Sequence, residues 1–524
     1  MTLISRVHFH CKLHPLARDL WLTAGSQVLI LVVNLLLVAL FGRLIGTVAL
    51  GEYLLLRRVV NGLQSGVQMG LGVAVPRFVA RSINRKGQER EAYFLAGLSC
   101  LISFAICSAL LLSAGRQFFA RWLLGNSQLI HLVLPLSLWL LALATHTAVY
   151  GYYRGILAMG RANSFQLVNL ALVPLVAVLA LFRTHSVGLI MSCMAASMLV
   201  GAGLFSAPIF HAVLVKGHDP DLPRYAAELL RYGVPRVPGE FGAGALLAAG
   251  PMVVSHYRPM AEVSYLLLGL SLLVAVGYAA APIGLVLLSK VSMMLAQGRF
   301  EEVRGRLVYL VTMTLELSVF IGLQLLVFND VLVNLWVGRG FQEATGVIRI
   351  LMLAIPAHLL YVVLGSVIDA ASPLPYDSRN VFISFATLLV LAGFVVKIGI
   401  PTLLLDAMAC TMVVALFVLA ALSLHTVMRL YDVRVEWIHS VVPVLIGVLF
   451  AAASISIHSV RGLKTGFIEL AFIQSTMGLL FLGLLRKWRS PWLAFLWAIS
   501  LGRAALDDRA ISDSVSEKKA LAVR

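Results

Sequence analysis

Polar side chains recur at helical spacing within residues 51–81, a stretch that is otherwise apolar and rich in glycine. At about 100° per residue, Arg57, Asn61, Gln64 and Gln68 fall on one helix face, within roughly 60° of one another. A guanidinium followed by three amides can bind an anion and exchange hydrogen bonds with neutral polar groups. The set holds no acid–base pair and no nucleophile, so the chemistry that it predicts is binding.

The opposite face of the same helix carries glycine at every fourth position. Gly62, Gly66 and Gly70 lie about 180° from the polar residues, and this small-xxx-small pattern lets a neighbouring helix pack closely. Because a polar stripe is unstable against lipid, we expect the stripe to face a water-filled cavity or the interior of a helix bundle. Arg58 lies off the stripe, and we expect its side chain to snorkel toward the membrane surface.

A second candidate binding group lies in residues 228–255. Arg236 and Glu240 are one helical turn apart and can pair. Pro235 and Pro238 each remove a backbone hydrogen-bond donor beside them. Two interpretations stay open: a hinge at the start of the second half of the chain, or a turn at the membrane surface with an interfacial ion pair. The guanidinium would add a second cation to the site predicted above.

Carboxylates within apolar segments are candidates for coupling transport to an ion gradient. Glu316 has no partner nearby in the sequence, so it is either protonated or paired across helices, and Glu240 is the other candidate. The chain carries no nucleophile motif, no paired carboxylates at a membrane surface, no P-loop and no metal-ligand spacing. We therefore expect a transporter rather than an enzyme, with no metal and no cofactor.

The composition indicates which elements must hold these residues. Of 524 residues, 60% are hydrophobic and only 12% are charged, which is too apolar for a soluble domain. We predict an all-α, polytopic membrane protein with about fourteen stretches long enough to cross the ~30 Å bilayer core. These stretches are residues 20–46, 52–80, 92–114, 129–152, 163–182, 186–213, 228–255, 261–289, 305–328, 345–369, 379–396, 399–425, 440–456 and 465–485.

The distribution of charge predicts the orientation in the membrane. The formal net charge of +17 would suggest nucleic-acid binding in a soluble chain. With both termini in the cytosol, about 28 of the 41 Lys and Arg residues lie in cytosolic segments and about nine lie outside. This positive-inside bias accounts for the excess without any nucleic acid.

An internal repeat predicts how the helices are grouped. Shifting the sequence by about 212 positions places Leu20–Leu54 over Tyr232–Leu266 without gaps. We expect two six-helix lobes in parallel orientation, followed by two further helices. The expected division is a cytosolic N-terminal tail (1–19), an N-terminal lobe (20–215), a C-terminal lobe (216–430), two additional transmembrane helices (431–485), and an interfacial segment with a cytosolic tail (486–524).

Several of these segments resemble the multidrug/oligosaccharidyl-lipid/polysaccharide exporter (MOP) superfamily, and its polysaccharide-transport flippases in particular. GEYLLLRRVVNGLQSGVQMGLGVAVPRFVARSINRKGQ is similar to the second helix of those flippases, with Arg57-Arg58, Val75-Pro76 and Lys86-Gly87 at the matching places. RYGVPRVPGEFG and APIGLVLLSKVSMMLAQGR are similar to the seventh and eighth helices. Asp369-Ala370, with Pro375-Tyr376 and Asn380, resembles the loop between the tenth and eleventh helices.

The resemblance implies a flippase that moves polyprenyl-pyrophosphate-linked oligosaccharide, an O-antigen, capsule or exopolysaccharide unit, across the cell inner membrane by alternating access. It also implies membrane lipids, glycosyltransferases and a glycan polymerase as partners. Residues 261–289 contain no arginine, whereas lipid II flippases carry one in that helix, which favours the general polysaccharide branch. One alternative is a cation-coupled multidrug exporter of the same superfamily. A membrane glycosyltransferase or polymerase would need an outer catalytic loop, and no polar stretch is long enough to provide it.

Overall fold

Apolar stretches of this length fold as helices because the bilayer core offers no hydrogen-bond partner to a free backbone N–H or C=O. The computed structural model describes residues 15–82, 89–216, 219–371, 376–433, 438–461 and 464–487. Over these ranges the chain is helical and contains no strand. It is an all-α, multi-pass membrane protein, as the composition predicts.

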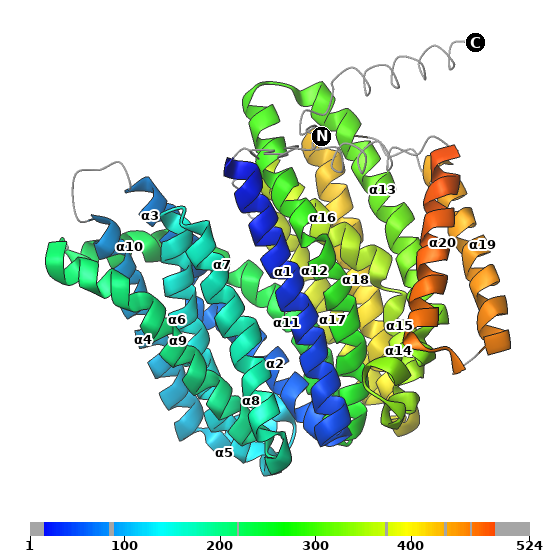
Figure 1. Cartoon of the computed structure of the whole chain (residues 1–524), viewed down its shortest axis with the longest axis horizontal. Coiled ribbons are helices and arrows are strands. Elements are labelled where there is room, and N and C mark those ends of the chain that lie inside the picture. The colour runs from blue at the N-terminus through cyan, green and yellow to red at the C-terminus, as the bar shows by residue number, and fades with distance from the viewer. Residues whose placement is uncertain are drawn as a thin grey trace, which may run out of the picture.

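The first half of the chain forms a bundle that lies on one side of the molecule (Figure 1). A five-residue π-helix, Phe41–Ile45, directly follows its first helix. The helices are α1 (Pro15–Leu40), α2 (Thr47–Gln68), α3 (Leu71–Arg81), α4 (Glu89–Ala114), α5 (Arg116–Leu124), α6 (Val133–Gly155), α7 (Met159–Leu167), α8 (Val173–Leu181) and α9 (Val187–Lys216).

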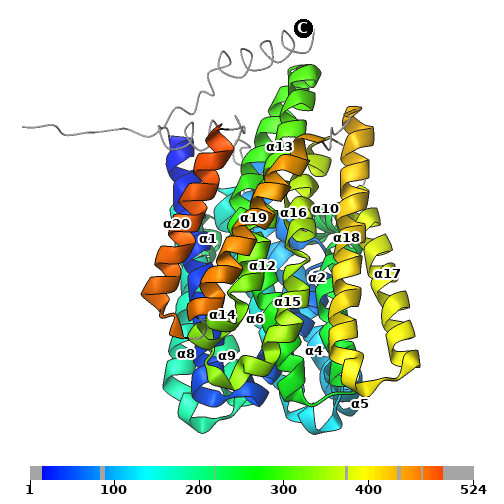
Figure 2. The same cartoon turned by 90° about the vertical axis from the view of Figure 1, so that its right-hand side faces the viewer.

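The second half forms another bundle beside it, and the last two helices pack on the outside of that bundle against α13 (Figure 2). The helices are α10 (Leu222–Gly233), α11 (Val237–Ser255), α12 (Met260–Ala296), α13 (Phe300–Val327), α14 (Asn329–Trp336), α15 (Thr345–Met352), α16 (Ile355–Ala371), α17 (Tyr376–Ile398), α18 (Leu404–Tyr431), α19 (Ile438–Arg461) and α20 (Phe467–Lys487).

The order of elements repeats between the two halves. Helices α2, α4 and α6 begin at Thr47, Glu89 and Val133, while α12, α13 and α15 begin at Met260, Phe300 and Thr345, close to the 212-residue shift seen in the sequence. The short helices α5 and α14 occupy the same place in each half, and each is followed by a glycine with positive φ. The division into lobes at residues 215/216 and 430/431 stays a prediction.

The predicted number of membrane spans is roughly consistent with the structure. Eleven helices are long and apolar enough to cross a membrane, and α15 with α16 adds a twelfth, bent by 51°. The polar residues of α2 keep the α2–α3 segment out of this set. Helix α19 also falls outside it, because only Leu445–Val460 counts as an apolar helix there. Adding these two segments gives the expected pattern of about fourteen.

The second predicted span, residues 52–80, is broken, where we expected one continuous helix. Helix α2 ends at Gln68, and the next two residues, Met69 and Gly70, both adopt the left-handed conformation, with φ of 48° and 70°. Two successive left-handed residues cannot continue a right-handed helix. Helix α12, which α2 matches in the repeat, runs without interruption through the same level.

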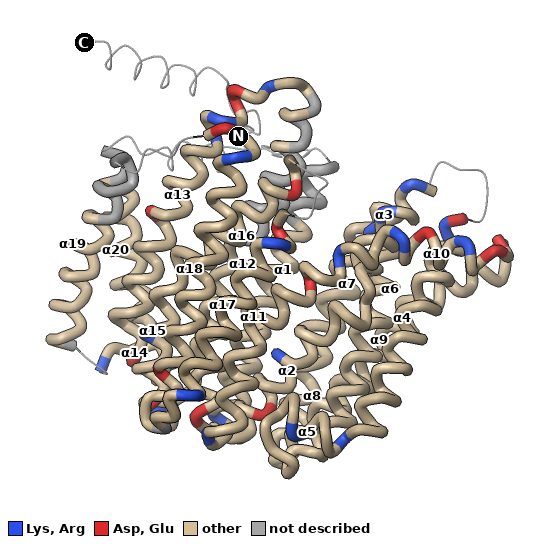
Figure 3. Tube along the Cα trace, turned by 180° about the vertical axis from the view of Figure 1, so that it is seen from behind, with Lys and Arg blue, Asp and Glu red and all other residues tan. Residues whose placement is uncertain are grey.

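Helix α2 forms most of the contact between the two halves, because it packs against α11 and α12 as well as against α6. Helix α10 belongs to the second half and leads into α11, but it packs against α3 and α4 of the first half (Figure 1). Charged residues gather at the two ends of the bundle and are sparse between them (Figure 3). The structure therefore places the polar chemistry of the membrane region around α2 and α11.

Candidate transport site

Three of the four predicted stripe residues on α2 are left available to a ligand. Arg57 is half-buried, and its guanidinium carbon lies 5.9 Å from the centroid of the Tyr53 ring. Asn61 is exposed and Gln64 is half-buried. Within the described residues these three side chains make no hydrogen bond and no ion pair. An anion or a hydroxyl could therefore bind to them without displacing an internal partner.

Gln68, the fourth residue of the stripe, is held inside the first half of the chain. Its Nε2 donates a hydrogen bond to Thr147 Oγ1 of α6 at 2.6 Å. The threonine hydroxyl in turn donates to the Leu143 carbonyl one turn earlier. This chain of hydrogen bonds fixes the end of α2 against α6, directly before the break at Met69 and Gly70.

The predicted glycine face packs closely at two of its three positions. A Cβ on Gly244 of α11 would lie 3.0 Å from the Asn61 carbonyl oxygen and from the Gly62 Cα. Gly70 lies so close to the Gly233 carbonyl that a Cβ there would overlap it. The packing prediction is therefore confirmed at Gly62 and Gly70. It is wrong at Gly66, where a Cβ would meet nothing within 4 Å.

Arg236 lies in a 3₁₀ turn, Val234–Arg236, between α10 and α11. Its exposed guanidinium is 4.3 Å from the centroid of the Tyr232 ring. Arg236 attracts the half-buried Glu240 electrostatically, but the two form no direct ion pair within the described structure. The backbone is interrupted beside the two prolines, as the hinge interpretation requires.

Two further carboxylates lie in the same electrostatic group. Asp369 near the end of α16 interacts with Arg236, and Asp377 in the first turn of α17 interacts with Asp369. Asp377 Oδ1 is buried without a hydrogen-bond partner. Arg236 thus attracts Glu240 and Asp369, and Asp377 is linked to it only through Asp369. The sequence drew attention to Asp369 only as part of a loop that resembles the superfamily, and it gave no signal for Asp377, because acidic residues at helix ends usually face water.

Arg58 is half-buried, and its charge interacts with Tyr278 of α12 and His358 of α16. His358 is buried, packs directly against Gly277 of α12, and has an unpartnered Nδ1. Arg58 therefore interacts with groups of the second half, while Arg57 lies over Tyr53 of its own helix. The snorkelling of Arg58 stays a prediction.

Glu316, the other predicted coupling residue, is 3% exposed in the middle of α13. That helix packs against α16 and α19. Glu316 has an interaction partner of its own, and it is not among the groups that shift Glu240, Asp369 or Asp377. Its role in coupling stays a prediction.

Comparison with known proteins finds likeness in structure alone. The sequence matches no protein-family model and no curated protein. The lipid II flippase MurJ, in an inward closed conformation, superposes with a TM-score of 0.69 and 13% identity, over 90% of this chain and 99% of that chain. An inward-facing multidrug resistance MATE transporter of the MOP superfamily has a TM-score of 0.63 and 15% identity, over 78% of this chain and 98% of that chain. The Vibrio cholerae MATE transporter VcmN has a TM-score of 0.53 and 16% identity, over 79% of this chain and 97% of that chain.

The chain has the fold of the MOP superfamily. The resemblance noted in the sequence is thereby supported at the level of fold. The solved structures that share this fold are transporters. In this MOP-type fold the two halves of the chain meet at α2, α11 and α12, and the predicted binding residues Arg57, Asn61 and Gln64 lie on one of those three helices.

At the bundle end that carries α5 and α14, specific contacts tie the two halves of the MOP fold together. Arg43 Nε donates to the Trp336 carbonyl at 3.0 Å, and the same guanidinium also reaches the Leu335 carbonyl. Trp336 Nε1 donates back to the Leu35 carbonyl at 2.8 Å. Because the last carbonyls of α14 have no partner within the helix, one guanidinium caps α14 and joins the halves at once.

Proposed function

We propose that this protein is a flippase that moves a polyprenyl-pyrophosphate-linked oligosaccharide across the cytoplasmic membrane by alternating access of its two halves. The observation that carries the proposal is the unpartnered cation–amide stripe of Arg57, Asn61 and Gln64 on a helix that packs against both halves. A lipid-linked sugar needs a cation for its pyrophosphate and amides for its hydroxyls. No catalytic step is part of the proposal.

The second cation of the site is proposed to be Arg236. Arg57 comes from the first half of the chain and Arg236 from the second, so a lipid-linked pyrophosphate that contacts the two cations in turn could bias how the halves sit. Gln68 is proposed to act by holding α2 against α6, since its amide already donates to Thr147. Glu240 contributes by keeping Arg236 in an electrostatic group with Asp369.

The comparisons favour a flippase over an exporter in one respect. The MurJ structure covers 90% of this chain, whereas the MATE structures cover 78–80%. The two C-terminal helices, α19 and α20, are the part that the shared six-plus-six pattern leaves over. At 13% identity this likeness concerns the fold. The absence of arginine from residues 261–289 supports a lipid-linked oligosaccharide other than lipid II.

A cation-coupled multidrug exporter is the second candidate, and one observation favours it. The carboxylates Glu240 and Asp369 interact with Arg236, and Asp377 interacts with Asp369; such an acidic group would suit a cationic substrate or a coupling ion. In the flippase proposal the same carboxylates, with Glu316 as a further candidate, couple transport to an ion gradient. Drug resistance on overexpression, without a glycan defect on deletion, would favour the exporter.

The test of the flippase proposal is a glycan assay in cells that lack the chromosomal copy. Arg57→Ala and Arg236→Ala should abolish the surface glycan while the protein still inserts at normal levels. Arg116→Ala is the matched control, because Arg116 is an exposed arginine of α5 without a partner in the described structure. Normal glycan with both site variants would overturn the proposed site.

We further propose a setting for the flippase. By the positive-inside rule, the bundle end that carries α3 and α10 would face the cytosol, and the protein would lie in the bacterial inner membrane. Its partners there would be glycosyltransferases that build the lipid-linked unit and a glycan polymerase that uses it. Labelling of single cysteines added near residues 82 and 126 with an impermeant thiol reagent tests this orientation.

A further inference from the structure

Two arginines from different halves of the chain lie on one tyrosine ring. The guanidinium carbons of Arg77 (α3) and Arg236 lie 4.6 Å and 4.3 Å from the centroid of the Tyr232 ring. Arg77 Nη1 also donates a hydrogen bond to the Tyr232 hydroxyl at 2.6 Å. Neither arginine has a carboxylate within ion-pair distance in the described structure. Holding two like charges this close costs free energy that a bound anion would recover.

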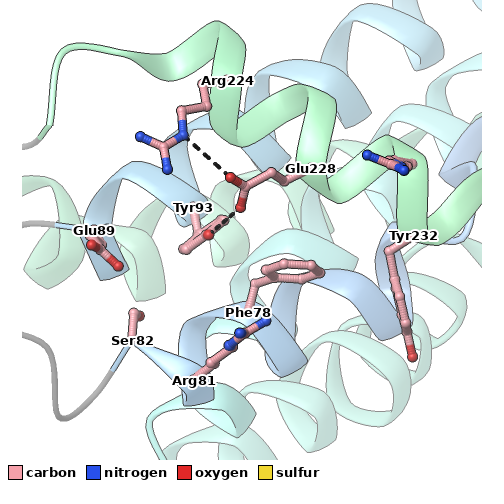
Figure 4. Close-up of a pocket in the computed structure, with 9 residues that line it drawn as sticks. Phe78, Arg81, Ser82, Glu89, Tyr93, Arg224, Glu228 and Tyr232 are labelled. Carbon is pink, nitrogen blue, oxygen red and sulfur yellow. Dashed lines mark hydrogen bonds and ion pairs between the residues drawn. The ribbon is translucent and has the colours of Figure 1, made fainter.

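A pocket of about 490 Å³ opens beside the same tyrosine, between α3, α4 and α10 (Figure 4). Its lining includes the exposed arginines Arg81 and Arg231, and within the described residues neither forms an ion pair or a side-chain hydrogen bond. The Arg81 guanidinium lies next to Phe78 (Figure 4). Two uncommitted guanidiniums in a concave site can bind a phosphate group.

The carboxylates of this pocket do not neutralise those two arginines. Glu228 accepts a hydrogen bond from the Tyr93 hydroxyl at 2.6 Å and one from Arg224 at 3.4 Å (Figure 4). Glu89, which also lines the pocket, has an interaction of its own. Arg224 and Glu228 thus satisfy each other, and Arg81 and Arg231 keep their positive charge available.

We propose that Arg77, Arg81 and Arg231, arranged around Tyr232, bind a phosphate or pyrophosphate group at this end of the bundle. The site is separate from the α2 stripe, because Arg77 lies on α3, beyond the break at Met69 and Gly70, whereas Arg57 lies on α2. The assignment of this group to the transported lipid rests on the proposed function. The binding of a phosphate group by these arginines does not depend on the proposed function.

The site would act as a loading position for the substrate. A lipid-linked pyrophosphate in the inner leaflet carries its charge at the level of the headgroups, where α3 and α10 end in the proposed orientation. Arg236 contacts the same ring from the second half and also belongs to the proposed transport site. An anion bound around Tyr232 could therefore pass to Arg236 and the interior. Anionic phospholipid headgroups share this chemistry and are the other source of such a group.

Binding to the purified full chain tests the proposal. The protein is placed in phosphatidylcholine nanodiscs, and inorganic pyrophosphate and farnesyl pyrophosphate are titrated by calorimetry. All variants carry Arg57→Ala, which removes the stripe as a competing site. The test variant adds Arg81→Gln and Arg231→Gln and leaves the Arg77–Tyr232 contact intact, so that loss of packing is not the cause. The control adds Arg116→Gln and Arg121→Gln at the opposite end of the bundle.

We expect the Arg81→Gln/Arg231→Gln variant to bind both probes about tenfold more weakly, or worse, and the control to bind within twofold of its parent. Equal affinity in the test variant and its parent, or no binding once Arg57 is replaced, would overturn the proposal. Phosphatidylglycerol that competes with pyrophosphate would assign the site to lipid headgroups. Tighter binding of farnesyl pyrophosphate, unaffected by phosphatidylglycerol, would assign it to the substrate. A failed glycan assay would leave this binding result standing.

Discussion

At the scale of single residues, Arg57 is positioned by an aromatic neighbour that is itself rigid. Its guanidinium lies 5.9 Å from the Tyr53 ring centroid, and Tyr53 is 1% exposed and stacked on Phe41 with ring centroids 4.1 Å apart. A cation held against a fixed ring loses less side-chain entropy when it binds an anion. The environment of Arg57 is therefore suited to an arginine in particular and not to positive charge in general.

The first prediction concerns that distinction. Arg57→Lys keeps the charge but loses the planar fork and the stacking surface, so flipping in proteoliposomes should fall roughly tenfold, by about 1.4 kcal/mol. Arg57→Ala should reduce it further. The control is Arg116→Lys, which should leave the flipping rate unchanged. Equal flipping rates for Arg57→Lys and the wild type would mean that only charge matters at this position.

The second prediction concerns the carboxylates beside Arg236. In Asp377→Asn and Asp369→Asn the group loses negative charge, so transport should persist at a reduced rate but no longer respond to an imposed ion gradient. Asp406→Asn is the matched control, because Asp406 lies in the first turn of α18 and belongs to no such group. Initial rates with and without the gradient give the readout. If transport by both variants still depended fully on the gradient, Asp369 and Asp377 would not be the coupling residues, and Glu316 would be the next candidate.

At the scale of elements, the break between α2 and α3 meets the turn between α10 and α11. Gly70 has a φ of 70°, and Gly233, directly before the 3₁₀ turn, presses against it. Each element is interrupted where it touches the other, so neither a side chain nor a regular helix fits there. This contact joins α3 to the end of α10.

The third prediction follows from this contact. Gly70→Ala forces an L-residue into the left-handed region, at about 1–2 kcal/mol, and its Cβ would overlap the Gly233 carbonyl. For a chain of this length the strain alone should lower the melting temperature in detergent by about 1–2 °C, and the overlap should lower it further. Gly66→Ala lies within α2 with open space around it and should melt at or slightly above the wild type, because alanine is the better helix former. If the two variants melted alike, the close packing at Gly70 would not matter for stability.

At the scale of the whole molecule, the two halves are tied at the end that carries α5 and α14. Gly42 packs against Val337 and Phe341 there, next to the hydrogen bonds between Arg43 and the end of α14. Alternating access requires these contacts to separate and reform. They would act as the outer closure of the transport pathway in the proposed orientation.

The fourth prediction tests that closure by cross-linking. A Cβ on Gly42 would lie 3.2 Å from the Val337 Cβ, slightly less than the 3.5–4.5 Å of a disulfide. In a background without the native cysteines, Gly42→Cys with Val337→Cys should therefore cross-link on mild oxidation and stop transport. Reduction should restore it. Each single variant serves as a control, and transport that continues in the fully cross-linked protein would show that this end need not open.

Much of the fold could be predicted from the sequence because its signals are local. Apolar length predicted the spans, and the 212-residue shift predicted the repeated element order that Thr47 and Met260 illustrate. The break at Met69 and Gly70 was missed, because a glycine within an apolar run also fits a continuous helix. The binding role of the stripe stays a prediction: Arg57, Asn61 and Gln64 make no hydrogen bond or ion pair within the described residues, whereas Gln68 is bound to a threonine in another helix.

The sequence alone determined that this chain is an all-α membrane protein with a polar stripe on its second span, because period and hydropathy are properties of neighbouring residues. Only the tertiary structure decided which distant groups share a site. It brought Asp369 into interaction with Arg236 and Asp377 into interaction with Asp369, and it put the guanidiniums of Arg77 and Arg236 on the Tyr232 ring. These groupings depend on how helices pack across the bundle, and no spacing along the chain encodes that packing.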